Sequence, residues 1–381
     1  MQPRVMTIYG TRPEAVKVAP VIRAIETSAT LASTVVVTGQ HREMLDQVNE
    51  VFGITPDQDL DVFAAGQGLN QIMAKVFARL DPVLEQIQPD AVLVQGDTTT
   101  VAAASIAAFN REIPVVHLEA GLRSGNLDSP FPEEANRRLT SQVARLHLAP
   151  TRGAGDNLLR ENIDPAAVAV TGNTVIDALL HTVEQQVTIT NTTLARHLAQ
   201  QTPMVLVTTH RRENWGDAMA GVGQALRELA QAHPDHVFVL PAHRNPVVRE
   251  AILPALVGIA NVLVTEPLPY GEFTRLLAAS RVTLTDSGGV QEEAPSLGVP
   301  VLVMRENTER PEAVDAGTVR LIGTSRPRIV EEVSRLLTDS DAHQDMARRV
   351  NPYGDGRAAT RCVAAIEELL GVGTRIPDFG L

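Results

Sequence analysis

The chain has 381 residues with 33 basic and 45 acidic side chains, and its net charge of −12 argues against nucleic acid as a partner, since such binding needs basic surfaces that release counterions. Its single cysteine, Cys362, excludes an internal disulfide, and neither an N-terminal signal peptide nor an apolar stretch of about 18 residues occurs, so we expect a cytoplasmic protein without a membrane partner. The length is more than one hydrophobic core ordinarily fills and predicts two domains.

Apolar runs of strand length recur along the chain, about five before residue 172 and about five after it. They are continuous rather than alternating, which is typical of strands buried on both faces of a parallel sheet. The runs are Val5–Tyr9, Thr34–Thr38, Ala91–Gln95, Pro114–Leu118, Val168–Val170, Val205–Thr209, Val237–Leu240, Val262–Thr265, Val282–Thr285 and Val301–Met304.

Helical patterns lie between these runs, and the alternation of strand and helix predicts an α/β protein with parallel sheets. The clearest are Glu43–Phe52, Leu69–Ile87, Val101–Asn110, Asp217–His233 and Arg328–Thr338. A polar stretch without strand signals, residues 184–202, places the domain boundary within residues 171–202. We assign residues 1–172 to an N-terminal domain and residues 173–356 to a C-terminal domain.

Glycine-containing and charged segments directly follow many of the apolar runs. In parallel sheets ligands bind outside the carboxyl ends of the strands, so these segments are candidate site loops, although loops collect polar residues in any protein. In the first half they are GTRPEAVK, GQHREM, GDTTT and Glu119, and in the second half HRREN, PAHRN, DSGGVQEEAPS and RENTERPE.

The segment DSGGVQEE places two glycines between a strand and a helix. The backbone N–H groups of Ser287, Gly288 and Gly289 are expected to face an anion such as a diphosphate there. Glu293 would sit two turns into the helix, where its carboxylate can accept the hydroxyls of a ribose. The alternative is an ordinary glycine turn with a solvated helix face.

Arg12, Lys17 and Arg310 are the basic residues best placed after strands to neutralise a diphosphate, and surface salt bridges are the alternative for each. Three acids in the first half, Asp97, Glu119 and Glu133, are candidates for proton transfer, because neighbouring carboxylates raise one another's pKa. A helix cap for Asp97 and a helix-dipole contact for Glu133 remain open. His210 can bind phosphate, shuttle a proton or serve as a structural donor.

Two familiar motifs are missing or misplaced. The turn after the first strand is GTRPEA rather than GxGxxG, so the dinucleotide fingerprint of Rossmann oxidoreductases is absent there. The acids of Asp57-Gln-Asp59 and Asp59-Leu-Asp61 follow a loop with proline rather than a buried strand, and we interpret them as solvated acids rather than metal ligands.

The chain resembles the non-hydrolysing bacterial UDP-N-acetylglucosamine 2-epimerases along nearly its whole length. The resemblance is carried, in order, by GTRPEAVKVAP, TGQHREMLDQV, GDTTT, HLEAGLRSG, SPFPEEANRRLT, TGNTVIDALL, HRREN, TDSGGVQEEAPSLGVPVLVMR, TERPEAV and NPYGDG. It implies a GT-B fold, with two Rossmann-like domains whose parallel sheets face a central cleft. The C-terminal residues, about 357–381 with a helix over Arg357–Leu370, would pack back on the first domain.

The resemblance also implies reversible epimerisation at C2 between UDP-N-acetylglucosamine and UDP-N-acetylmannosamine. In this family UDP is eliminated and re-added through a 2-acetamidoglucal intermediate, without cofactor or metal, and the product supplies cell-envelope polysaccharide. A homodimer is expected. Possible rival functions for such a chain are a GT-B glycosyltransferase, a hydrolysing epimerase and an inactive nucleotide-sugar sensor; retention of all three acids favours the epimerase.

Site residues follow from the resemblance position by position. The residues matching the UDP-binding positions are Arg12, Lys17, His210, Phe273, Ser287, Gly288, Gly289, Glu293 and Arg310, and Arg137 is placed with the substrate-binding residues. Asp97, Glu119 and Glu133 match the catalytic acids of the family, and His210 is also expected to be catalytic. The chain departs from the family near Leu268, which leaves the uracil contacts open. A second, activating UDP-N-acetylglucosamine is expected at Gln40, His41, Gln67, Arg211 and His243.

Overall fold

The computed structural model describes residues 2–39, 42–64 and 66–380, apart from the side chains at positions 42–44 and 213. Contacts divide the chain into two compact units. Unit 1 comprises Met1–Ala178 together with Tyr353–Leu381, and unit 2 comprises Leu179–Pro352. The chain passes from unit 1 to unit 2 within one helix, α7 (Thr174–Glu184).

Unit 1 is built on a seven-stranded parallel sheet in the order β3-β2-β1-β4-β5-β6-β7. The central strands are buried along almost their whole length, as their unbroken apolar sequence requires. The strands are β1 Arg4–Tyr9, β2 Ala32–Val37, β3 Gln58–Asp59, β4 Ala91–Gln95, β5 Val115–Leu118, β6 Leu146–Ala149 and β7 Val168–Val170.

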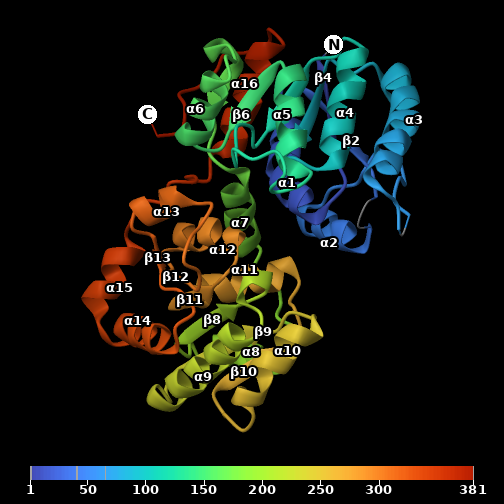
Figure 1. Cartoon of the computed structure of the whole chain (residues 1–381). Coiled ribbons are helices and arrows are strands. Elements are labelled where there is room, and N and C mark those ends of the chain that lie inside the picture. The colour runs from blue at the N-terminus through green and yellow to red at the C-terminus, as the bar shows by residue number, and fades with distance from the viewer. Residues whose placement is uncertain (1, 40–41, 65, 381) are drawn as a thin grey trace. The chain divides into compact units, whose positions relative to one another are not determined.

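Helices connect these strands (Figure 1). Apolar side chains of α3 and α4 are buried with those of β1, β2 and β4 in one core. The crossover helices are α1 Arg12–Glu26, α2 Arg42–Phe52, α3 Leu69–Ile87, α4 Thr99–Asn110, α5 Glu133–Val143 and α6 Arg152–Arg160. Thr98 caps α4, since its side chain accepts the Val101 N–H, so the capping role considered for Asp97 belongs to its neighbour.

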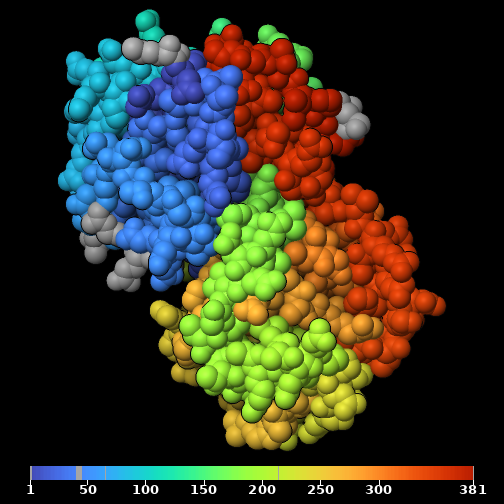
Figure 2. Space-filling view, turned by 180° about the vertical axis from the view of Figure 1, so that it is seen from behind, coloured from blue at the N-terminus to red at the C-terminus, as the bar shows by residue number. Residues whose placement is uncertain are grey.

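The last helix, α16 (Ala358–Leu369), belongs to unit 1 and packs against α1, and both views show the C-terminal segment beside the N-terminal one (Figures 1 and 2). Beyond it, the chain runs along the edge strand β7. The Phe379 N–H donates to the Val170 carbonyl at 2.7 Å, and the Arg375 guanidinium donates to the Val168 carbonyl at 2.8 Å. The tail therefore covers part of an edge whose backbone groups would otherwise need other partners.

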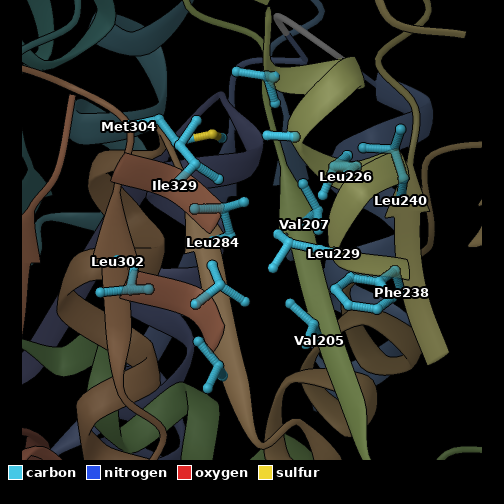
Figure 3. Close-up of a cluster of buried hydrophobic side chains, with 14 of the residues drawn as sticks. Val205, Val207, Leu226, Leu229, Phe238, Leu240, Leu284, Leu302, Met304 and Ile329 are labelled. Atoms are coloured by element: carbon cyan, nitrogen blue, oxygen red, sulfur yellow. The ribbon is translucent and has the colours of Figure 1, made fainter. Parts of the chain in front are cut away.

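Unit 2 repeats the plan with a six-stranded parallel sheet in the order β10-β9-β8-β11-β12-β13. Side chains of β8, β9, β11 and β12 gather with those of helices α9 and α14 in one core (Figure 3). The strands are β8 Met204–Thr208, β9 Val237–Pro241, β10 Val262–Thr265, β11 Val282–Thr285, β12 Val301–Val303 and β13 Val319–Leu321. The helices are α8 Thr192–Ala199, α9 Asp217–Ala232, α10 Pro246–Ile252, α11 Tyr270–Ala279, α12 Gly288–Glu293, α13 Pro311–Asp315, α14 Arg326–Thr338 and α15 Ser340–Ala347.

The sheets contain more strands than the five per half expected from sequence. The additional strands are β3, β6 and β13, which have two to four residues each. β3 is exposed, and β13 has an arginine at its centre, so neither shows a continuous apolar run. Asp57, Asp59 and Asp61 are exposed, in agreement with their interpretation as solvated acids.

Two Rossmann-like units with parallel sheets are the architecture of the GT-B fold, and this prediction is confirmed. Within the part of the chain that the structure describes, no helix is both long and apolar enough to span a membrane.

Candidate active site

In unit 1 the strand order reverses between β1 and β4, which are neighbours in the sheet. Such a reversal leaves the loops at the carboxyl ends of these strands free to diverge, and ligands of open α/β sheets bind there. The loop after β1 leads into α1 at Arg12, and the loop after β4 contains Gly96 and Asp97. Sequence-predicted residues thus occupy the loops on both sides of the reversal.

Glu119 follows β5 directly and is held by two neighbours. It forms an ion pair with Lys17 of α1, and its other carboxylate oxygen accepts a hydrogen bond from the Gln95 amide. Its backbone adopts the left-handed conformation, with a φ of 62°, which is unfavourable for residues other than glycine. The structure therefore brings an expected catalytic acid against a lysine expected to bind UDP.

Asp97 is also paired with a cation. Its carboxylate forms an ion pair with Arg137 of α5, and its backbone carbonyl accepts a hydrogen bond from the Asn136 amide at 2.9 Å. The Asp97 side chain remains 27% exposed. Arg137 is thus well placed to hold an acid while leaving that acid accessible. Glu133, the first residue of α5, is half-buried.

Glu134, beside Glu133, is a buried acid that sequence reasoning overlooked. It accepts hydrogen bonds from the Ser124 N–H and the Arg138 guanidinium, both at 2.9 Å, and lies 3.4 Å from Arg137. Burial raises the pKa of Glu134, but these hydrogen bonds outweigh burial and hold the pKa below its usual value. The helical spacing of Glu134 to Arg137 and Arg138 was the available signal in the sequence.

Glu14 is a second overlooked acid, buried at the reversal point itself. Its carboxylate accepts the N–H groups of Gly10 and Thr11 at 2.6 and 2.9 Å, and the Thr98 hydroxyl donates to it at 2.6 Å. Burial raises the pKa of Glu14. The Thr11-x-x-Glu14 spacing of a capping box was the available sequence signal for this local contact, but the link to the loop after β4 required the fold. Arg12, within this capped turn, is half-buried.

In unit 2 the order reverses between β8 and β11, and His210 and Asp286 follow these two strands. The His210 Nδ1 atom lies 3.0 Å from an Asp286 carboxylate oxygen. Asp286 is fully buried, whereas the His210 side chain is 42% exposed. A buried carboxylate thus supports an accessible imidazole at the point where the fold places ligands.

The glycine segment after Asp286 opens α12 beneath Arg310. A Cβ atom on Gly288 would lie only 2.5 Å from an Arg310 guanidinium nitrogen, so the arginine passes directly over this glycine. Arg310 is held there by Glu292 at 2.7 Å. The Ser287 N–H donates to the Thr285 hydroxyl at 2.9 Å, so of the three expected anion-facing N–H groups this one already has a partner inside the protein.

Glu293 is the last residue of α12, close to two turns from its start as expected, and the α-helix ends there. Pro295 cannot continue the α-helical hydrogen bonding, and the chain proceeds as a short 3₁₀ turn over Ala294–Leu297. The Tyr270 hydroxyl donates to the Glu293 carboxylate at 3.4 Å. Tyr270 begins α11, which also carries the half-buried Phe273, and sequence reasoning had not selected it.

The residues expected at a second ligand site come from both units, and within unit 2 the structure brings His243 close to His210 and Arg211. Gln40 and His41 lie outside the described residues. In unit 2 the His243 and His210 ring centroids are 6.2 Å apart, and Arg211 follows His210. Gln67 belongs to unit 1, where its side-chain oxygen accepts the Ala64 N–H at 2.6 Å. Among the residues that the structure describes, no group of three or more His, Cys, Asp or Glu residues is arranged to hold a metal ion.

A family model described as UDP-N-acetylglucosamine 2-epimerase matches residues 23–367. The chain belongs to this family. A relative in the family, the UDP-N-acetylglucosamine 2-epimerase of Salmonella typhimurium, is 51% identical over 371 residues, which cover 96% of this chain and 98% of the relative.

Solved structures of family members agree with the fold. The UDP-GlcNAc 2-epimerase of Neisseria meningitidis, solved bound to UDP-GlcNAc, is 47% identical with a TM-score of 0.83, covering 97% of this chain and 100% of that one. The S. aureus MnaA structure with UDP is 43% identical with a TM-score of 0.86 and covers 100% of both chains. Nucleotide and nucleotide sugar are therefore ligands of structural relatives.

Proposed function

We propose that this enzyme interconverts UDP-N-acetylglucosamine and UDP-N-acetylmannosamine by inverting the configuration at C2. The observation that carries the proposal is the pairing of Glu119 with Lys17 and of Asp97 with Arg137 at the ligand-binding edge of unit 1. Carboxylates held by cations and still partly exposed are suited to proton transfer. The family membership and the UDP-GlcNAc bound in the Neisseria relative support this substrate.

The chemical difficulty is that the C2–H bond is not acidic, because no carbonyl adjoins it. Cleavage of the C1–O bond to UDP puts positive charge on C1, and the neighbouring C2 proton then becomes removable. Loss of that proton gives 2-acetamidoglucal, with UDP retained in the site. Protonation of C2 on the opposite face and re-addition of UDP at C1 complete the inversion. The route transfers protons and a diphosphate, and no hydride carrier is consumed.

The residues of unit 2 would hold the leaving UDP in this route. Arg310 and the N–H groups of Gly288 and Gly289 would neutralise the diphosphate, with Arg12 and Lys17 as further cations. Glu293 would accept the ribose hydroxyls, and Phe273 would contact the base. Asp97, Glu119 and Glu133 would exchange protons at C2, and His210 would assist at the diphosphate.

Incubation with UDP-N-acetylglucosamine in heavy water, followed by proton NMR, tests the proposal. We expect UDP-N-acetylmannosamine to appear with deuterium at C2. Release of free N-acetylmannosamine and UDP would instead indicate a hydrolysing enzyme, and turnover only with an added sugar acceptor would indicate a glycosyltransferase. Binding of the substrate without any product would indicate a nucleotide-sugar sensor.

We also propose that a second UDP-N-acetylglucosamine activates the enzyme at the cluster of His243 and Arg211 beside His210. The proximity of the two imidazole rings supports this, because His243 and Arg211 offer donors to a second diphosphate next to the one that His210 would contact. The reaction from pure UDP-N-acetylmannosamine should then be slow until a trace of the other sugar is added, and His243→Ala should blunt that stimulation. Hyperbolic kinetics in both directions would argue against the second site.

Two wider proposals accompany the activity. The product would feed synthesis of cell-envelope polysaccharide, and the enzyme would act as a homodimer. Deletion of the gene should deplete polymers containing N-acetylmannosamine-derived units, and light scattering of the purified protein should give twice the chain mass of 41.0 kDa.

A further inference from the structure

Asp286 directly follows β11 and accepts several hydrogen bonds inside unit 2. Its side chain is fully buried. Its Oδ2 atom accepts the backbone N–H groups of His210 and Arg211, both at 3.0 Å, and the Thr209 hydroxyl at 3.1 Å. The Asn214 amide adds a longer contact of 3.3 Å. Burial raises the pKa of Asp286, but these donors and His210 outweigh it and hold the pKa below its usual value, so the group is an anion at neutral pH.

The contact between Asp286 and the His210 ring restricts where the imidazole carries its proton. An ionised carboxylate can only accept hydrogen bonds, so at 3.0 Å the Nδ1 atom of His210 must be the donor. A neutral imidazole has one protonated nitrogen, and with that proton on Nδ1 the Nε2 atom becomes the acceptor. The opposite tautomer would place an Nδ1 lone pair against a buried anion.

We propose that Asp286 is a positioning residue that fixes the His210 proton on Nδ1, so that Nε2 alone exchanges a proton with the diphosphate of the leaving UDP. This inference rests on the proposed function. When the C1–O bond breaks, its electron pair stays on the diphosphate oxygen. That oxygen takes the proton from the Nε2–H of the imidazolium, and the nitrogen keeps the N–H electron pair. When UDP adds back to C1, the proton returns to Nε2.

A purely structural role for Asp286 must be distinguished from control of the His210 tautomer, because the same carboxylate also accepts hydrogen bonds from Thr209, His210 and Arg211. The substitution Asp286→Asn distinguishes them. An asparagine oxygen can still accept the backbone N–H groups, while its NH₂ group faces His210 as a donor. The His210 ring would then have to present an unprotonated Nδ1 and carry its proton on Nε2.

Nitrogen-15 NMR of the full chain labelled at histidine reports the tautomer directly, with the His210 signals assigned by their loss in His210→Gln. We expect a protonated Nδ1 in the wild type and a protonated Nε2 in Asp286→Asn. The same variant should lose kcat by about 10²–10⁴-fold, as when a supporting aspartate of a catalytic histidine is changed to asparagine, with UDP affinity changed by less than about threefold. Fluorescence of Trp215, which packs against the core of unit 2, checks folding.

Thr209→Val is the matched control, because it removes another hydrogen bond to Asp286 without altering the imidazole contact. It should leave the His210 tautomer unchanged and kcat within a few-fold of wild type. A wild-type spectrum with the proton on Nε2 overturns the proposal whether or not Asp286→Asn folds. So does a folded Asp286→Asn variant with near-normal kcat. Absence of epimerisation by the wild type would instead count against the proposed function, and the tautomer would still decide the role of Asp286.

Discussion

The two units share a scaffold and differ in chemistry. Both are parallel sheets that reverse their strand order next to the first strand, between β1 and β4 in unit 1 and between β8 and β11 in unit 2. At the first reversal the chain places partly exposed acids paired with Lys17 and Arg137. At the second it places a histidine on a buried acid and glycines beneath Arg310. The fold therefore determines where each site lies, and the loops determine what it can do.

This contrast predicts different kinetic consequences for changes in each unit. Loss of an acid in unit 1 should reduce the rate of the chemical step, because the acids exchange protons in the transition state. In unit 2, loss of a contact at the glycine segment, Arg310 or Glu293 should mainly weaken nucleotide binding, whereas loss of the Asp286 contact to His210 should act on kcat. The expected effects below run from the largest to the smallest.

The substitutions Asp97→Asn, Glu119→Gln and Glu133→Gln should each reduce kcat by about 10²–10⁴-fold, since each removes an acid–base group while keeping its shape. UDP affinity by calorimetry should change little. Glu50→Gln, at an exposed acid on α2, is the control and should be active. A variant that keeps near-normal turnover and still incorporates deuterium at C2 would lose its assigned role.

Gly288→Ala should weaken UDP binding by about 1.5–3 kcal/mol, because the added methyl group would displace the Arg310 guanidinium and its charged hydrogen bonds. Gly289→Ala is the matched comparison: its Cβ would meet nothing closer than a serine oxygen at 4.0 Å. Calorimetry with UDP measures both. Equal losses for the two variants would show that the position of Arg310 does not explain the effect.

Glu293→Ala should weaken UDP binding by about 1–3 kcal/mol through loss of hydrogen bonds to the ribose. The same variant should bind 2′-deoxy-UDP with a smaller relative loss, because that ligand lacks one of the hydroxyls. Unchanged UDP affinity by calorimetry would remove Glu293 from the nucleotide site.

Acid should destabilise unit 1 through His117, which is fully buried on β5 and whose Nε2–H donates to the Gly96 carbonyl at 2.8 Å. Burial lowers the pKa of His117 to about 3 from its usual 6.5. Below pH 6.5 the unfolded chain therefore takes up a proton at His117 while the folded chain does not. The contribution of His117 to the free energy of unfolding is fully present above pH 6.5 and decreases as the pH falls.

The matched variants His117→Gln and His236→Gln isolate that contribution. Between pH 6.5 and 4.5 the wild type should lose about 1–2 kcal/mol more unfolding free energy than His117→Gln, measured by hydrogen exchange in unit 1 peptides with intrinsic rates corrected for pH. His236 in unit 2 is only partly buried, and its removal should change the pH dependence less. If the unfolding free energy of unit 1 depended on pH identically in His117→Gln and wild type, His117 would not be the source of the acid sensitivity.

Tyr270→Phe should have the smallest effect, about 0.5–1.5 kcal/mol in UDP affinity, because the hydrogen bond that it removes from the Glu293 carboxylate is long, at 3.4 Å. Combining it with Glu293→Ala should add nothing further, since the tyrosine hydroxyl would act through that carboxylate. Additive losses would indicate that Tyr270 contacts the nucleotide independently.

Sequence patterns located the strands well where apolar residues run without interruption. The bounds of Ala91–Gln95 and Val282–Thr285 were predicted without error, because strands buried on both faces tolerate few polar residues. Those of the partly exposed edge strand Val262–Thr265 were also predicted without error, from its apolar residues. The short strands β3 and β13 were not predicted. β3 is exposed and β13 contains an arginine, so neither forms a continuous apolar run in the sequence.

The sequence also predicted which loops hold the candidate residues, but not how they pair. Lys17 and Glu119 are 102 positions apart and meet only because the sheet places β1 and β5 on either side of β4. The buried acids Glu14, Glu134 and Asp286 escaped selection because their importance lies in the backbone N–H groups they accept, and these partners are defined only by the fold.

The return of the C-terminal helix to unit 1 has a consequence for the order in which the molecule is completed. Unit 2 is encoded as one uninterrupted stretch, Leu179–Pro352, whereas unit 1 is encoded in two pieces. During synthesis from the N-terminus, α16 emerges after every residue of unit 2. The surface of α1 that α16 covers in the folded chain therefore stays exposed to solvent while unit 2 is synthesised. The unit whose synthesis begins first is the one whose last helix is made last, so a released chain that ends at Pro352 would contain all of unit 2 but only part of unit 1.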